Sequence, residues 1–218
     1  MKRVITSFLI VAMIIMLSGC GFSLPFLSKP EDVVDEFMKQ EVLMDLLAEM
    51  DDFIDEDYDD YGSKFWTKVL SSASMKSLLL DNVRSISYTI TDVSTNGNSS
   101  KVTALITHYD MSPIVDRALE IFINRGEEMD NSGVEVPESE DELIELLLNV
   151  ATQSFKEAIS KTKPTETYTK IRFDCEKDSS GVWELSEMPD GFIEKVLLMN
   201  MESAIDDGLK SYDIDSLD

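Results

Sequence analysis

The chain has 218 residues, of which 43 are Asp or Glu and 19 are Lys or Arg, so its formal net charge at pH 7 is −24. A balance this acidic repels nucleic acids and anionic lipid headgroups, which excludes nucleic-acid binding as a function. Because 43% of the residues are hydrophobic, the chain is not a disordered acidic tail, and its length suits one domain or one domain with an elaboration.

The first 22 residues, MKRVITSFLIVAMIIMLSGCGF, begin with two cations and continue as an apolar run. From Val4 to Leu17 a helix would cover only about 21 Å, which is short of the roughly 30 Å hydrocarbon core of a bilayer. A positive start, a short apolar run and small residues after it are typical of a secretory signal. Residues 1–19 are therefore predicted to be a signal peptide.

The signal ends in Leu17-Ser18-Gly19-Cys20, which resembles the lipobox of bacterial lipoproteins, L-[AS]-[GA]-C, at every position. Cysteine suits this role because a thiolate is the side chain that is most readily alkylated. The resemblance implies that the chain is cut between Gly19 and Cys20 and that the thiol of Cys20 carries a diacylglyceryl anchor. It also implies a lipoprotein on the extracytoplasmic face of the cell membrane, as in Gram-positive bacteria, where two acyl chains give stable membrane binding.

After the anchor, the segment 20–29 and Pro30 include two prolines, a glycine and two serines. This composition predicts a short tether that keeps the following domain close to the bilayer. Apolar residues then recur at helical spacing over about 30–50 and again over about 63–80. Each of these two stretches is predicted to be a helix.

The period of the apolar residues then changes to two, over residues 86–90 and 102–109, which predicts two strands. Between them, Asn96-Gly97 accepts the positive φ angles of a tight turn, so the strands should form an antiparallel hairpin. His108, the only histidine of the chain, shares a face with the apolar residues of the second strand. It is predicted to point into the core or into a cavity.

The remaining elements are two helices, a second hairpin and a final helix, at about 113–125, 139–163, 167–185 and 189–210. The first of these helices should end near Gly126, and Pro164 should end the second. In the hairpin, Cys175 shares an apolar face with Ile171 and Phe173, so it is predicted to be a small core residue. With Cys20 acylated, Cys175 would have no partner for a disulfide.

Two helices, a hairpin and a late strand that ends in the phrase GVWEL, residues 181–185, resemble the cone-shaped α+β fold named after nuclear transport factor two, also called cystatin-like. The resemblance covers about 30–110 and 165–187, and it extends to Gram-positive lipoproteins of unknown function. It implies one α+β domain over 30–218, with helices on the concave side of an antiparallel sheet built from both hairpins and a helical insertion at about 113–163. The alternative is a helical bundle with appended hairpins.

The acidic stretch 51–60 contains Asp55, Asp57 and Asp59 at the 1, 3, 5 spacing of a calcium loop. In this frame position 6 is aspartate where the pattern needs glycine, and position 12 is tryptophan where it needs glutamate. A frame that starts at Asp57 fails at positions 5 and 12. The stretch is therefore interpreted as a solvated loop between helices, with a looser divalent-cation site at the three aspartates as the alternative.

The sequence contains no serine-hydrolase motif, glycine-rich phosphate loop or paired metal-ligand motif, so no catalytic residue and no cofactor is predicted. Some proteins of the cone fold are isomerases that use an aspartate base and a tyrosine donor in an apolar pocket. The resemblance makes Asp110, Tyr88 and Tyr109 candidates for those roles. His108 is interpreted as a hydrogen-bonded structural histidine, and a catalytic or metal-binding role is the alternative.

An anchor, a short tether and an acidic domain together favour a non-enzymatic function. We expect a membrane-anchored lipoprotein that binds an envelope protein, a peptide or a small ligand through the concave face of the sheet. The alternatives are a cone-fold enzyme with a pocket carboxylate and a divalent-cation binder that uses the acidic stretch.

Overall fold

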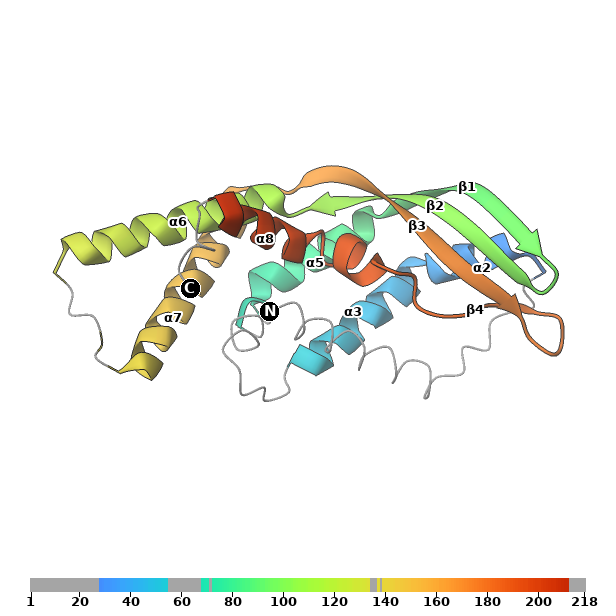
Figure 1. The fold of residues 1–218 in the computed structure, drawn as a ribbon, viewed down its shortest axis with the longest axis horizontal. Helices are drawn as coiled ribbons and strands as arrows, with labels where there is room; N and C mark the ends of the chain where they lie inside the picture. The colour runs from blue at the N-terminus through green and yellow to red at the C-terminus, as the bar shows by residue number, and fades with distance from the viewer. Residues whose placement is uncertain (1–27, 55–67, 71, 134–136, 138, 212–218) are drawn as a thin grey trace.

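The structure is a computed structural model, and it describes residues 28–54, 68–70, 72–133, 137 and 139–211. Its helices and strands carry the labels of Figure 1. In chain order they are α2 (Pro30–Phe37), α3 (Gln40–Ile54), α5 (Ala73–Ser85), β1 (Ser87–Asn96), β2 (Ser99–Asp110), α6 (Ser112–Asn131), α7 (Glu140–Lys161), β3 (Thr165–Lys177), β4 (Trp183–Leu185), the π-helix η1 (Phe192–Leu197) and α8 (Met201–Ser211).

The four strands form one antiparallel sheet in the order β1-β2-β3-β4. The β1–β2 hairpin turns at Gly97, whose φ of 62° lies in the left-handed region that the Asn-Gly pair was expected to supply. The α6–α7 helices connect β2 to β3, which are nevertheless direct neighbours over their whole length, from Ser99 opposite Glu176 to Asp110 opposite Thr165. Both hairpins therefore lie in one sheet, as predicted.

One face of the sheet carries the core of this end of the molecule. The inward residues of β2 and β3 alternate with exposed ones, and Val102, Ala104, Ile106 and Phe173 are fully buried. Helices α2 and α5 and the π-helix η1 pack against this face. Sequence periodicity and packing thus agree on which face is buried.

Three phenylalanines from separate elements meet in this core. Phe37 of α2 lies 5.6 Å from Phe173 of β3 and 5.0 Å from Phe192 of η1, measured between ring centroids, in edge-to-face arrangements. Such pairs contribute roughly 0.5–1.5 kcal/mol beyond the burial of their surface. The cluster joins the first helix, the sheet and the C-terminal segment.

A second core lies among α5, α6, α7 and α8, and the molecule is elongated as a result, with the sheet at one end and the α6–α7 hairpin at the other (Figure 1). Helix α8 lies close against α6, since a Cβ at Gly208 would lie 2.3 Å from Cδ1 of Leu119. A larger residue at this position would displace the end of the Leu119 side chain, so glycine favours the close approach of the two helices.

The predicted helix over 30–50 is two helices, because the chain turns between α2 and α3. At the turn the N–H of Lys39 bonds to the carbonyl of Glu36, three residues back, while Met38 is buried. The predicted helix over 63–80 is described only in part. Residues 68–70 are helical, and α5 then starts after Ser72, whose hydroxyl accepts the N–H of Met75 (3.3 Å).

The prediction that a helix ends near Gly126 is wrong, since α6 continues to Asn131. Glycine inside a helix costs only about 1 kcal/mol relative to alanine, and the neighbouring turns outweigh this cost. The helix ends instead just before Gly133, which has a positive φ of 64°.

The predicted final helix over 189–210 is divided into η1 and α8. Met199 and Asn200, with φ of 55° and 58°, separate the two elements. The carbonyl of Met199 accepts the backbone N–H of Met111 (2.9 Å), so this corner is bonded to the junction of β2 and α6. Left-handed backbone is usually signalled in a sequence by glycine or asparagine, whereas Met199 is a buried apolar residue. The helical spacing of apolar residues also continues across this corner, so the sequence did not indicate it.

The prediction of an α+β domain with helices on an antiparallel sheet is confirmed, and the alternative of a bundle with appended hairpins is wrong. The four strands form one continuous sheet, and its buried side chains pack directly against those of the helices in one core. The predicted signal peptide, 1–19, and most of the tether, 20–29, lie outside the described residues.

Candidate functional site

A buried polar cluster lies where the sheet end meets the helical end. Asn82 of α5 has no exposed surface, and its amide nitrogen donates to the carbonyls of Val196 (2.8 Å) and Leu197 (3.3 Å) in η1. Its amide oxygen accepts the backbone N–H of Tyr109 in β2 (2.9 Å). The Asn82 side chain thus forms hydrogen bonds with backbone groups of two elements. These bonds offset the free-energy cost of burying a polar side chain.

His108 lies beside this cluster on the buried face of β2, as predicted. Its Nδ1 lies 2.6 Å from the carbonyl oxygen of Tyr109 and its Nε2 lies 2.8 Å from the hydroxyl of Thr169. Burial lowers the pKa of His108, against smaller opposing effects of the Tyr109 carbonyl and the Asp110 charge. A neutral ring that donates from Nδ1 and accepts at Nε2 uses both nitrogens, so the arrangement is structural.

The residues suggested for isomerase-like chemistry do not converge. Asp110 accepts hydrogen bonds from the N–H (2.8 Å) and hydroxyl (2.6 Å) of Ser112, at the start of α6. The hydroxyl of Tyr88 donates to Asp35 of α2 (2.8 Å), and burial, then that bond, raise its pKa to about 12. Tyr88 is paired with Ile106, four residues or roughly 14 Å from Asp110 along β2. The backbone N–H of Tyr109 bonds to Asn82, so it is not available as a hydrogen-bond donor near Asp110 or Tyr88.

Cys175 is a core residue with 1% of its surface exposed, as predicted. Burial, and then the charges of Asp174 and Glu31, raise the pKa of its thiol to about 12. A nucleophilic cysteine requires the thiolate. In this environment the thiol stays protonated at neutral pH.

The remaining predicted site residues lie outside the described part of the chain. These are the cleavage and lipidation residues Gly19 and Cys20 and the cation-site candidates Asp55, Asp57 and Asp59. Their roles stay predictions. Within the described ranges, no group of three or more His, Cys, Asp or Glu side chains could hold a metal ion. No helix among those residues is long and apolar enough to cross a bilayer.

The face of the sheet that carries the helices, which was expected to be concave and to bind a ligand, is covered by those helices. Ile171 is 3% exposed and Ile106 is fully buried beneath α2, α5 and η1, so a ligand would have to displace the core. The face that is open to solvent is the opposite one, where Leu105 and Tyr168 are 41% and 69% exposed. The expectation of a concave binding face is therefore corrected.

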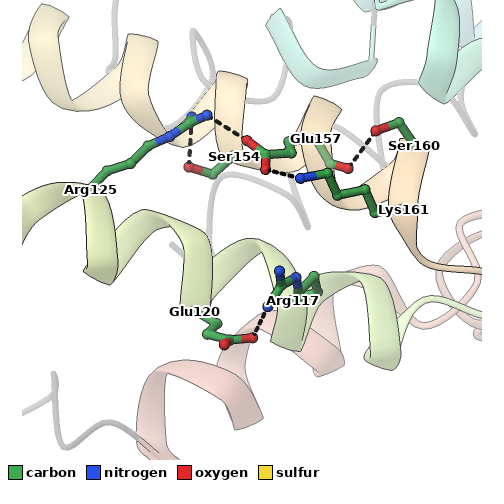
Figure 2. Close-up of polar contacts among 7 residues, drawn as sticks. All are labelled: Arg117, Glu120, Arg125, Ser154, Glu157, Ser160 and Lys161. Atoms are coloured by element: carbon green, nitrogen blue, oxygen red, sulfur yellow. Dashed lines mark hydrogen bonds and ion pairs between the residues drawn. The ribbon is translucent and has the colours of Figure 1, made fainter.

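The α6–α7 hairpin has a packed base that is joined by an ion-pair network, shown in Figure 2. The guanidinium of Arg125 on α6 donates to the hydroxyl of Ser154 (3.3 Å) and pairs with the carboxylate of Glu157 (2.6 Å) on α7. Lys161 donates to the other oxygen of Glu157 (2.6 Å), and this bond is the largest cause of the lowered pKa of Glu157. Ser154 is fully buried, so the network lies at the edge of the helical core.

Away from the base the two helices diverge (Figure 1), and we call residues 122–133 and 141–151 the hairpin tip, with Arg125 of the network at its inner edge. None of these residues is buried, although α6 and α7 bury nine residues nearer the base. The tip is nevertheless rich in large apolar side chains, and Leu147 is 45% exposed. The other large apolar side chains of the tip are half-buried, and they are Phe122, Ile123, Met129, Leu143, Ile144, Leu146, Leu148 and Val150.

Sequence reasoning missed this surface, because the apolar spacing of α7 is also that of an ordinary core helix. The phrase ELIELLLNV, residues 142–150, contains the signal that could have found it. Leu143, Leu147 and Val150 fit one helical stripe, but Ile144 and Leu148 widen it over about half of the circumference. A stripe that wide needs more than one neighbouring element to cover it.

No protein-family model matches the chain, and no curated protein sequence matches it. Among solved structures, the chain is similar to that of "a putative lipoprotein (ycdA) from Bacillus subtilis subsp. subtilis str. 168", with 18% sequence identity and a TM-score of 0.38. The similarity covers 78% of this chain and 46% of that one, so this chain spans less than half the length of that protein. A similarity at this level establishes neither a shared fold nor a shared function.

Proposed function

We propose that the protein is a lipoprotein, held on the extracytoplasmic face of the cell membrane by a diacylglyceryl group on Cys20, and that it acts there by binding a protein or peptide partner. The observation that carries the anchor is the match of Leu17-Ser18-Gly19-Cys20 to the lipobox at each of its four positions, directly after an apolar run too short to span a bilayer. Gram-positive origin and the cone-fold relationship belong to the same proposal.

The arrangement of the described side chains supports binding in preference to catalysis. His108 uses both ring nitrogens in the fold, Asp110 caps α6, and the thiol of Cys175 is held protonated by burial. An active site needs such groups to converge on a space where a substrate fits. Among the described residues, large apolar side chains such as Leu105, Leu147 and Tyr168 are exposed on the surface, which suits a macromolecular partner.

The anchor is tested by lipid labelling of the native chain in a bacterial host. With an alkyne-bearing fatty acid in the medium, the wild-type protein should take up label and fractionate with membranes, and mass spectrometry should find a diacylglyceryl-modified Cys20 as its first residue. Cys20→Ala should abolish the label. Cys175→Ala is the matched control, since it removes the other cysteine and should leave labelling intact. An unmodified Cys20 in the native protein would refute the anchor.

The cation-binding alternative rests on Asp55, Asp57 and Asp59 and is tested by calorimetry. Calcium titrated to millimolar concentration into the full chain should release or absorb heat if these carboxylates form a site. The triple substitution of these residues by asparagine should remove that heat. Absence of heat in the wild-type chain removes the alternative.

A further inference from the structure

We propose that the hairpin tip is the docking surface for a cationic amphipathic helix of a partner protein. This rests on the proposed binding function and names the surface and the chemistry of the partner. It does not depend on the lipid anchor, so the two can fail separately.

The apolar side chains of α7 at the tip continue the stripe that is buried at the base. Leu143, Leu147 and Val150 precede Ser154 and Ala158 at intervals of four, three, four and four residues, so all five lie on one side of the helix. Ser154 and Ala158 are fully buried, whereas none of the first three is buried. The stripe is continuous, and its coverage becomes partial toward the tip, where Leu147 is exposed and Leu143 and Val150 are half-buried.

The same change occurs along α6. Ala118 is 1% exposed in the helical core, and Phe122, Arg125 and Met129 follow it on the same side at intervals of four, three and four residues. Neither Phe122 nor Met129 is buried. Along both helices the apolar stripe is therefore fully covered at the base and only partly covered at the tip, where a third helix could complete the packing.

Charge decides which helix fits. The tip carries six acidic side chains, at positions 127, 128, 130, 141, 142 and 145. Two cations are described there: Arg125, which is paired with Glu157, and Lys68, which donates to Asn149 (3.3 Å). An apolar surface with an acidic rim is complementary to a helix that has aliphatic residues on one side and Lys or Arg on the other. The stretch 141–151 covers about 16 Å, so about three turns of such a helix would match it.

The same charge argues against two other occupants. An anionic membrane surface would be repelled by the acidic rim. A second copy of the chain would bring two acidic rims together at one interface, which costs binding energy. The partner that the charges favour is therefore a basic one.

The test uses the full chain with Cys20→Ala, so that no lipid or detergent competes for the probe. The probe is a fluorescently labelled 14-residue peptide of leucine and lysine that is amphipathic as a helix, and fluorescence anisotropy measures its binding. Two peptides serve as controls, one with glutamate in place of lysine and one with serine in place of leucine. The leucine–lysine peptide should bind at least tenfold more tightly than either control.

Two pairs of matched variants locate the binding. Leu143→Ser with Leu147→Ser should weaken binding at least tenfold, whereas Leu80→Ser with Leu105→Ser, at exposed leucines elsewhere, should change it less than twofold. Glu142→Lys with Glu145→Lys should weaken binding far more than Glu184→Lys with Glu187→Lys, which changes the net charge equally. Equal effects within either pair, or no binding of the leucine–lysine peptide, would overturn the proposal.

The other occupants are distinct outcomes of the same variants, and each would also overturn the proposal. If the chain covers the tip itself, the Leu143→Ser, Leu147→Ser variant should lose more than about 4 °C in Tm, whereas a free surface should lose less than about 2 °C. If a second copy covers it, the variant should abolish a dimer seen by light scattering. If the tip binds a membrane, the wild-type chain should sediment with vesicles that contain phosphatidylserine.

Discussion

The two ends of the molecule contain similar apolar residues in opposite environments. On the sheet, Val102, Ile106 and Phe173 alternate with polar residues and are completely buried by the helices of the same chain. At the hairpin tip, where α6 and α7 diverge (Figure 1), Leu143 and Leu147 continue a buried stripe, but Leu143 is half-buried and Leu147 is 45% exposed. Apolar periodicity therefore predicts which side of an element is apolar, and not whether the chain itself covers that side.

The largest effect should come from the sheet core. Phe173→Ala removes a fully buried ring that packs edge to face against Phe37 and Phe192, and it should lower the free energy of unfolding by about 3–5 kcal/mol. Urea unfolding followed by circular dichroism measures this loss. A loss below about 1 kcal/mol would mean that the sheet core is no better covered than the tip.

The junction between the two ends should be the next most sensitive region. Asn82→Ala leaves the N–H of Tyr109 and the carbonyl of Val196 without their buried partner, and it should cost about 1–3 kcal/mol. Asn124→Ala, at an exposed asparagine of α6, is the control and should cost less than about 0.5 kcal/mol. Equal losses in the two variants would show that the cluster does not join the ends.

The junction should also make stability depend on pH. The pKa of His108 is lower in the folded chain than the ordinary value of 6.5, so below that pH the unfolded chain binds the proton first. The stability that the neutral, buried ring of His108 contributes is therefore present above its ordinary pKa and is lost as the pH falls below that value. His108→Gln should flatten the stability curve between pH 7.5 and 5.5, and parallel curves for the two proteins would contradict the assignment.

The smallest effect on stability should come from the tip. Leu147 is 45% exposed, so Leu147→Ala should change the free energy of unfolding by less than about 0.5 kcal/mol. The same urea titration as for Phe173→Ala provides the direct contrast. A loss of about 2 kcal/mol or more would place Leu147 in a core and remove the distinction between the two ends.

The sheet could be predicted from sequence because its signals are local. Strict alternation over 102–109 and the Asn96-Gly97 turn each specify one geometry, and the observed β1–β2 hairpin follows both. The ends of the helices were predicted less accurately than the strands. The left-handed corner at Met199 is stabilised by a bond to Met111, 88 positions away in the chain, and no local pattern encodes that contact.

The candidate surface was less accessible to sequence reasoning than the fold. His108 and Cys175 were placed on buried faces correctly, because alternation in a one-sided sheet determines burial. Whether the leucines of α7 are covered depends on the angle between α6 and α7, which is a tertiary property that helical spacing does not contain. The lipidation motif at Cys20 is the opposite case, since it is specified by four consecutive residues and needs no fold.

The central claim, that the hairpin tip is a free apolar surface which a basic helix covers, is tested most directly by thiol labelling of Leu147→Cys in the Cys20→Ala full chain. Position 147 should react with a maleimide at nearly the rate of an unfolded thiol, while Cys175, buried in the same molecule, stays unlabelled. Saturating leucine–lysine peptide should slow labelling at 147 at least tenfold. Labelling at 147 as slow as at Cys175 in the free protein, or undiminished by the peptide, would contradict the claim.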